Sequence, residues 1–228
     1  MKKIGMIVAV EMDAVLSRFG EPKGEEKRGG FTVYRYENET YELCVVSSGA
    51  GEIAAAAAAE LLITGYGVSL IVNFGVVGGL TEEMTMARTV VVERVVHTDF
   101  DTSDWDGCER GRYLAYPTRY VPADPELVRK ACEAAPELVP VTCASADKFV
   151  AGAEKKRALH EEFAADICEM EAAGILLTAN RAGVPCLLIK AVSDGITGGA
   201  EEFEREIRHS SEVCLEITDR IIRSLQRD

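Results

Sequence analysis

Short runs of apolar, often β-branched residues alternate along the chain with stretches of helical character. Strands that are apolar over most of their length, separated by helices, are typical of an α/β fold with a largely buried sheet. We predict strands over residues 3–10, 31–36, 41–48, 69–77, 87–96, 139–145 and 184–194, and a short strand leading into 169–171. We predict helices over residues 53–65, 125–135, 154–163, 172–180 and 202–226.

One helix-start signal strengthens this pattern, and one long segment departs from it. Asp124 offers a capping carboxylate, and Pro125 follows it at the first helical position. Residues 98–120 are polar and aromatic and predict a long loop, a feature that is usually functional or disordered. Because no linker-like segment or shift in composition divides the chain, residues 1–228 are predicted to form a single domain.

The amino-acid composition excludes some classes of binding partner. The chain has 228 residues, of which 47% are hydrophobic and 28% are charged, as expected for a globular protein. Its 38 acidic and 25 basic residues give a net charge of −13. Such a charge repels phosphate backbones and anionic lipids, so we expect no nucleic-acid and no membrane partner. No apolar run approaches the roughly 18–20 residues that a membrane helix needs, which predicts a cytoplasmic protein.

Cysteine and histidine positions argue against a metal or disulfide framework. The seven cysteines are an odd number, are widely spaced and contain no CxxC pair. The three histidines are scattered along the chain. We therefore expect reduced, structural thiols, no metal site and no cofactor.

A glycine turn after the strand at 41–48 resembles a dinucleotide-binding fingerprint. Gly49, Ala50 and Gly51 lie between this strand and the following helix, as the fingerprint requires. The fingerprint also requires an acid about 20 residues further on, and the strand that ends near Asn73 supplies none. A tight turn that lets the backbone approach a different ligand is therefore the favoured interpretation.

Acidic residues follow three of the apolar runs. Asp13, with Glu11 beside it, comes after the first predicted strand, Glu171 after the short strand, and Asp194 after the last one. In open parallel sheets, ligands bind in the crevice beyond the carboxyl ends of the strands. Each acid alone could be a cap or turn residue, but together they indicate a shared ligand site.

Several blocks of the sequence resemble the purine nucleoside phosphorylase/nucleosidase superfamily, and within it the methylthioadenosine/S-adenosylhomocysteine nucleosidases. The blocks are VNFGVVGGL at 72–80, SADKFV at 145–150, CEMEAAGI at 168–175 and KAVSDG at 190–195. They occur in the family's order and cover nearly the whole chain. The resemblance implies a central mixed, twisted sheet flanked by helices, and hydrolysis of the N-ribosidic bond of a 5′-modified purine nucleoside in methionine salvage.

The resemblance also implies roles for individual residues. Asp194 would protonate N7 of the leaving base, and Glu171 would bind the ribose hydroxyls with Met170 against the sugar. Phe149 would stack on the purine, whose edge the Val150 backbone would bind. The remaining implied contacts to substrate come from Ala50, Gly78, Glu169, Ser193 and Phe203.

The water site is where the chain departs from the family pattern. The family hydrolases have a glutamate after the first strand, and alignment on Lys3 places Asp13 there, with Glu11 as the next candidate. Val76 replaces a serine that contacts the water, and Lys190 replaces an arginine. We therefore expect slow hydrolysis, because catalysis is sensitive to small changes of position.

Three functions stay open on these grounds. They are hydrolysis, phosphorolysis, and nucleoside binding with little or no turnover. Asn73 stands where phosphate-using relatives carry an arginine, which favours hydrolysis over phosphorolysis. The aromatic residues of the loop at 98–120, and the resemblance, predict a homodimer with this loop at the interface.

Overall fold

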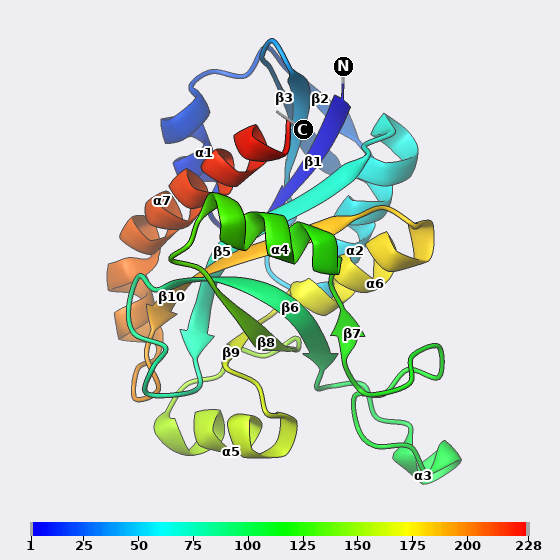
Figure 1. Ribbon diagram of the computed structural model, residues 1–228, viewed down its shortest axis with the longest axis vertical. Coiled ribbons are helices and arrows are strands. Elements are labelled where there is room, and N and C mark those ends of the chain that lie inside the picture. The colour runs from blue at the N-terminus through cyan, green and yellow to red at the C-terminus, as the bar shows by residue number, and fades with distance from the viewer. Residues whose placement is uncertain (1, 227–228) are drawn as a thin grey trace.

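The computed structural model describes residues 2–226, and these form one sheet covered by helices (Figure 1). The strands are β1 (Lys2–Val8), β2 (Gly24–Arg28), β3 (Phe31–Glu37), β4 (Tyr41–Ser47), β5 (Leu70–Gly79), β6 (Thr89–His97), β7 (Val121–Pro122), β8 (Val139–Ser145), β9 (Ile167–Glu169) and β10 (Cys186–Asp194). The helices are α1 (Met12–Phe19), α2 (Glu52–Glu60), α3 (Ser103–Asp106), α4 (Pro125–Ala134), α5 (Ala153–Phe163), α6 (Ala172–Ala182) and α7 (Ala200–Leu225), and a π-helical turn at Leu61–Gly65 continues α2.

The sheet closes partly on itself around β5. This strand pairs in parallel with β10 over most of its length, with β1 near its start, and antiparallel with β9 at its end. Since β10 pairs with β6, β6 with β8, and β8 with β9, five strands form a closed ring. Strands β1, β4, β3 and β2 extend the sheet outward from that ring. The mixed α/β fold expected from the sequence is confirmed.

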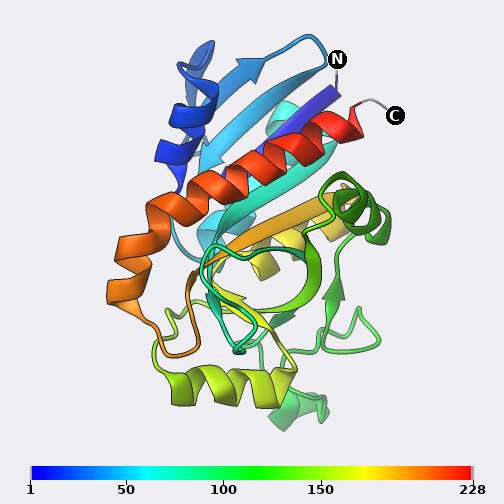
Figure 2. The same ribbon diagram turned by 60° about the vertical axis from the view of Figure 1, so that its left-hand side comes forward.

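Helices cover both faces of this sheet. The long α7 crosses β5 and β10, with α1 and α4 packed beside it (Figure 2). On the other face α2 packs against α6, where Ala55, Ala58 and Ala59 are buried. The alanine run thus serves both as a strong helix former and as a small surface that lets two helices approach closely.

The pairing brings several strand ends together. β1 runs parallel to β4 and β5, and β5 runs parallel to β10, so the carboxyl ends of these four strands lie on the same side of the sheet. Ligands of α/β proteins collect at such an edge. The topology therefore places the residues after β1, β4, β5 and β10 around one region.

Most predicted elements are present, and the differences have simple causes. The predicted cap of α4 forms, because the Asp124 carboxylate accepts hydrogen bonds from the amides of Glu126 and Leu127. β2 was missed because its five residues are polar edge positions with no apolar alternation. The predicted loop at 98–120 contains the short α3. Among residues 2–226, no helix has both the length and the apolar character that crossing a bilayer requires.

Candidate active site

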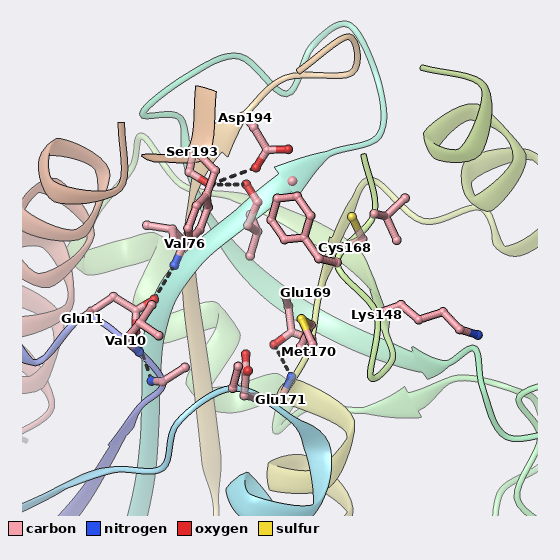
Figure 3. A pocket seen from close by; sticks show the side chains of 17 residues that line it. Val10, Glu11, Val76, Lys148, Cys168, Glu169, Met170, Glu171, Ser193 and Asp194 are labelled. Atoms are coloured by element: carbon pink, nitrogen blue, oxygen red, sulfur yellow. Dashed lines mark hydrogen bonds between the residues drawn. The ribbon is translucent and has the colours of Figure 1, made fainter. Parts of the chain in front are cut away.

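A cavity of about 280 Å³ lies at the carboxyl ends of the central strands (Figure 3). Eleven of the thirteen residues that the sequence singled out line it: Ala50, Val76, Gly78, Phe149, Val150, Glu169, Met170, Glu171, Ser193, Asp194 and Phe203. Residues separated by more than 140 positions in the chain thus meet at one cavity, because β5, β9 and β10 are neighbours in the ring. A concave apolar cavity with a few convergent polar groups is the usual form of a small-molecule site.

Asp13 does not lie in this cavity, which corrects the expectation for that residue. It is exposed in the first turn of α1, whereas the buried Glu11 just before α1 lines the cavity. The Glu11 carboxylate accepts hydrogen bonds from the backbone amides of Ala9 (3.0 Å), Val10 (2.9 Å) and Val76 (3.0 Å). The chain bends after β1, and this bend turns Glu11 inward and Asp13 outward.

Lys190 also lies outside the lining of the cavity. Its side chain is fully buried, and its Nζ donates to Glu169 Oε2 at 3.1 Å. Burial opposes its charge, but the carboxylates of Glu169 and Glu171 raise its pKa, so it remains a cation. Lys190 therefore acts on the site through Glu169, whose own carboxylate also caps the start of α6 by accepting from the amides of Glu171 and Ala172.

A further buried carboxyl group, that of Glu52, is not among the predicted site residues. Ser145 Oγ lies within hydrogen-bond distance of Glu52 Oε1 and, at 2.5 Å, of Glu169 Oε1, and it accepts from the amide of Ala173. A hydroxyl has a single proton to donate, so one of the two carboxyl groups must carry a proton of its own. Burial and the charge of Glu169 raise the pKa of Glu52 to about 8, which assigns the proton to Glu52.

Glu171 occupies the position between β9 and α6. Its Oε1 accepts a hydrogen bond of 2.9 Å from the amide of Gly51, the last residue of the glycine turn. Gly51 has φ +115°, a conformation that side chains disfavour, so the glycine is needed where the backbone meets this carboxylate. Burial and the charge of Glu169 raise the pKa of Glu171 to about 7.

Asp194 ends β10, next to an irregularity in the pairing with β5, and only 2% of it is exposed. Its Oδ1 accepts from Ser193 Oγ at 3.1 Å, and its Oδ2 accepts from Lys156 Nζ at 2.5 Å. Opposite lies Gly78, where a Cβ would come within 3.3 Å of Asp194 Oδ2. The absence of a side chain at Gly78 therefore lets the strand, and any ligand above it, approach the carboxylate.

Apolar side chains complete the cavity. The ring of Phe149 is half-exposed and meets Phe203 edge-on, with ring centroids 5.6 Å apart. Lys148 lies at the margin, directed away from the carboxylates (Figure 3), and its Nζ donates to Asp99 at 2.5 Å. An aromatic ring face at a cavity of this size can stack on a flat heterocycle.

The carboxylates lie on different sides of the cavity. In Figure 3, Asp194 is on one side, Glu171 on the opposite side, and Glu11 lies near the Val76 strand. A carboxyl group at one end can protonate a leaving group, while carboxylates at the other end can bind hydroxyls and stabilise a developing positive charge. This arrangement suits cleavage of a bond between a sugar and a basic heterocycle.

Comparisons with known proteins agree with this chemistry. Residues 3–223 match the family model of the phosphorylase superfamily. The chain is similar to a 5′-methylthioadenosine/S-adenosylhomocysteine nucleosidase from Shewanella halifaxensis, with 30% identity over 84% of this chain and 86% of the relative. It is also similar to an aminodeoxyfutalosine nucleosidase from Helicobacter pylori, with 27% identity over 92% and 95% of the two chains.

Solved structures agree in fold. A futalosine hydrolase from Helicobacter pylori superposes with a TM-score of 0.92 and 25% identity, over 98% of this chain and 99% of that one. A 5′-methylthioadenosine/S-adenosylhomocysteine nucleosidase from the same organism, complexed with a pyrrolopyrimidine-containing compound, also gives a TM-score of 0.92, over 97% and 98% of the two chains at 25% identity.

Proposed function

The chain belongs to the phosphorylase superfamily, and we propose that it is a nucleosidase that hydrolyses the N-ribosidic bond of a 5′-modified purine nucleoside. The observation that carries this proposal is the cavity in which buried Asp194 faces Glu171 and Glu11 across an apolar space. Asp194 is the proton donor, Glu171 binds the ribose, and Phe149 stacks on the purine.

The reaction needs a proton on the departing base. As the bond between C1′ and the purine nitrogen breaks, its electron pair goes to the base, and a proton from the Asp194 carboxyl group forms a bond to N7. General-acid assistance of this kind contributes roughly 10²–10⁴-fold. The sugar acquires oxocarbenium character, which the carboxylate of Glu171 stabilises while it binds the 2′- and 3′-hydroxyls.

Glu11 is the base that receives the proton of the attacking water. Its carboxylate is fixed by three backbone amides and lies at the cavity wall beside Val76. The water oxygen forms the new bond to C1′, and its proton passes to Glu11. Val76 contributes its backbone amide rather than a hydroxyl, so the glutamate is held from the main chain.

The charges that line the cavity argue against phosphorolysis, which would require a cation to bind the phosphate. Among the described residues of this lining, the cation is Lys148, and its Nζ is paired with Asp99 rather than directed at the carboxylates. A phosphate anion would meet Glu11, Glu169 and Glu171 without a compensating cation at the wall. Water is therefore the favoured nucleophile.

The similar proteins suggest two kinds of substrate. Methylthioadenosine or S-adenosylhomocysteine is the substrate that the name of the Shewanella relative suggests, and we propose that its cleavage serves methionine salvage. Aminodeoxyfutalosine is the alternative suggested by the name of the Helicobacter relative. Both are adenosines modified at the 5′ position, so the two alternatives share the chemistry of the cavity described above.

A nucleoside panel tests this proposal. The protein is incubated in phosphate-free buffer with methylthioadenosine, S-adenosylhomocysteine, aminodeoxyfutalosine and unmodified adenosine, and adenine release is followed by chromatography. We expect release from at least one 5′-modified nucleoside, and its loss in the Asp194→Asn variant. Binding without adenine release from all four would instead favour a binding protein without turnover.

We further propose a cytoplasmic homodimer with the loop at 98–120 at its interface. Phe100 and Tyr113 of this loop stack on each other with ring centroids 3.9 Å apart, but Trp105 is 79% exposed and Leu114 is 66% exposed. Large exposed apolar side chains such as these support a partner surface. Light scattering should give twice the mass of the chain, and a monomer that persists at micromolar concentrations would contradict the dimer.

A further inference from the structure

A lysine reaches Asp194 from the side away from the cavity. Lys156 lies in the first half of α5, between the exposed residues Lys155 and Arg157, yet its own side chain is 0% exposed. α5 therefore directs one cation of its charged sequence inward. Lys156 is absent from the lining of the cavity and meets the site only through Asp194 and the turn that follows it.

Among the described residues, this ammonium group donates its hydrogen bonds to one short stretch of chain. Lys156 Nζ donates to Asp194 Oδ2 at 2.5 Å, to the carbonyl oxygen of Gly195 at 2.7 Å and to that of Asp194 at 3.4 Å. A Cβ at Gly78 would lie 3.3 Å from Nζ as well as from Oδ2. The lysine and the carboxylate thus form one closely packed pair beneath the strand that faces the ligand.

This pair creates a conflict with the role proposed for Asp194. A general acid must carry a proton, but an adjacent ammonium group stabilises the ionised carboxylate. Burying an ammonium group is also unfavourable unless its partners compensate for the loss of water. The conflict disappears if the two residues act as a unit, because ammonium with carboxylate and amine with carboxylic acid contain the same number of protons and the same net charge.

We propose that Lys156 supplies the proton that Asp194 transfers to the leaving purine. The proposal rests on the nucleosidase function proposed above. An N–H bond of Lys156 breaks as an O–H bond forms on Asp194, and that carboxyl proton bonds to N7 as the base takes the electron pair of the ribosidic bond. The products leave a neutral amine beside a carboxylate, and the pair takes up a proton from water entering the vacated cavity. Lys156 is therefore a positioning residue that acts through Asp194.

Other charged and titratable groups near the pair have separate roles. Cys168 of β9 lies beside Gly78 and the pair, and burial raises the pKa of its thiol to about 12, so it remains protonated in neutral solution. Glu202 of α7 accepts a hydrogen bond from the amide of Gly195 at 2.8 Å. On α5 itself, Glu154, Lys155 and Arg157 are exposed. A difference in pH profile between the wild type and its Lys156 variants is therefore assigned to the pair itself.

The test is the pH dependence of kcat for the best nucleoside of the panel, measured for the wild type, K156M and K156R. Methionine has the length of lysine without its charge, so Asp194 must then hold its proton alone. We expect kcat of K156M to fall at least tenfold at pH 8, and its alkaline limb to move down by at least one pH unit. K155M, which changes the exposed neighbouring lysine, is the matched control and should leave the profile unchanged.

K156R separates proton supply from charge. Arginine keeps a positive charge and hydrogen-bond donors, but its guanidinium does not release a proton in proteins. We expect kcat of K156R to be at least tenfold below that of the wild type at every pH. Recovery of wild-type kcat in K156R, or a K156M profile that parallels the wild type, would overturn the proposal.

Folding is checked by thermal unfolding and by adenine binding. If K156M does not fold, K156Q replaces it, since the glutamine amide can still donate to Asp194 without a transferable proton, and the same outcomes apply. Failure of the proposed function looks different, because the wild type itself would then release no adenine from any nucleoside.

Discussion

Glu11 and Asp13 stand two residues apart, but only Glu11 lies in the cavity, held by the amides of Ala9, Val10 and Val76. We expect Glu11→Gln to lower kcat by about 10²-fold or more, because the amide cannot accept the proton of the attacking water. Asp13→Asn is the matched control and should change kcat by less than about twofold. Steady-state kinetics on both variants measure this, and the reverse order of effects would return the role to Asp13.

The raised pKa of Glu171 predicts how substrate affinity depends on pH. Burial and Glu169 raise its pKa to about 7, so its carboxyl group is protonated below that pH in the free enzyme. Ribose hydroxyls donate best to the ionised carboxylate, and KM should therefore fall as pH rises through 7 and then level off. In Glu171→Gln, KM should be higher and independent of pH. A wild-type KM that stays constant between pH 5.5 and 8.5 would exclude this role.

At the residue scale, the sequence predicts those side chains whose place follows from strand ends. Glu171 and Asp194 follow apolar runs, so their convergence could be expected. The choice between Glu11 and Asp13 depends on a bend that no pattern encodes. The inward position of Lys156 could have been inferred from the sequence. Leu159 and Phe163 follow it at helical spacing, which places it on the apolar face of α5.

At the scale of elements, Glu52 joins α2 to α6 and β8. Its carboxyl group contacts Ser145 Oγ and the amide of Gly174, in an interface where both helices are buried. Protonated Glu52 supplies the second proton that Ser145 and Glu169 need. The contact between the two helices, which also positions Glu171 and Gly51, therefore depends on a carboxyl group that stays neutral.

This dependence predicts how stability changes with pH. The pKa of Glu52 rises from 4.5 in the unfolded chain to about 8 in the folded one, so the folded state binds more protons between these values. The free energy of unfolding should therefore decrease as pH rises through this window. Glu52→Gln imitates the neutral form and should show a smaller decrease, because raised pKa values elsewhere, such as that of Glu171, still contribute to it.

Thermal unfolding of the wild type and the variant at pH 5, 7 and 9 measures the effect. We expect the wild type to lose stability relative to Glu52→Gln as pH rises. Glu60→Gln, on the exposed side of the same helix, is the control and should follow the wild type. If all three curves run parallel, the buried proton is not on Glu52.

Secondary structure was predictable where apolar periodicity was strong. The strand at 139–145 and the helix after Asp124 are found as expected, because a run of strand-forming residues and a helix cap are local signals. β2 has no apolar face to reveal it, whereas the short strand expected before Glu171 is found as β9, which ends at Glu169. There Glu169 accepts hydrogen bonds from the first amides of α6, an interaction that ends the strand.

At the scale of the molecule, the sequence indicated a mixed sheet but not its closure. The ring forms because β5 is long enough to pair with β1 near its start and with β9 at its end, while β10 runs along it. These are long-range pairings, and local patterns carry no information about them. The ring nevertheless determines the site, since it brings Gly78, Glu169 and Asp194 to one cavity.

The identity of the sugar product tests the central claim most directly. The protein is incubated with its preferred 5′-modified nucleoside in buffer containing excess phosphate, and the sugar is analysed by phosphorus NMR and mass spectrometry. Hydrolysis at this cavity predicts adenine and the free 5′-modified ribose, at a rate that does not depend on phosphate. Accumulation of a ribose 1-phosphate, with a rate that rises with phosphate concentration, would contradict it.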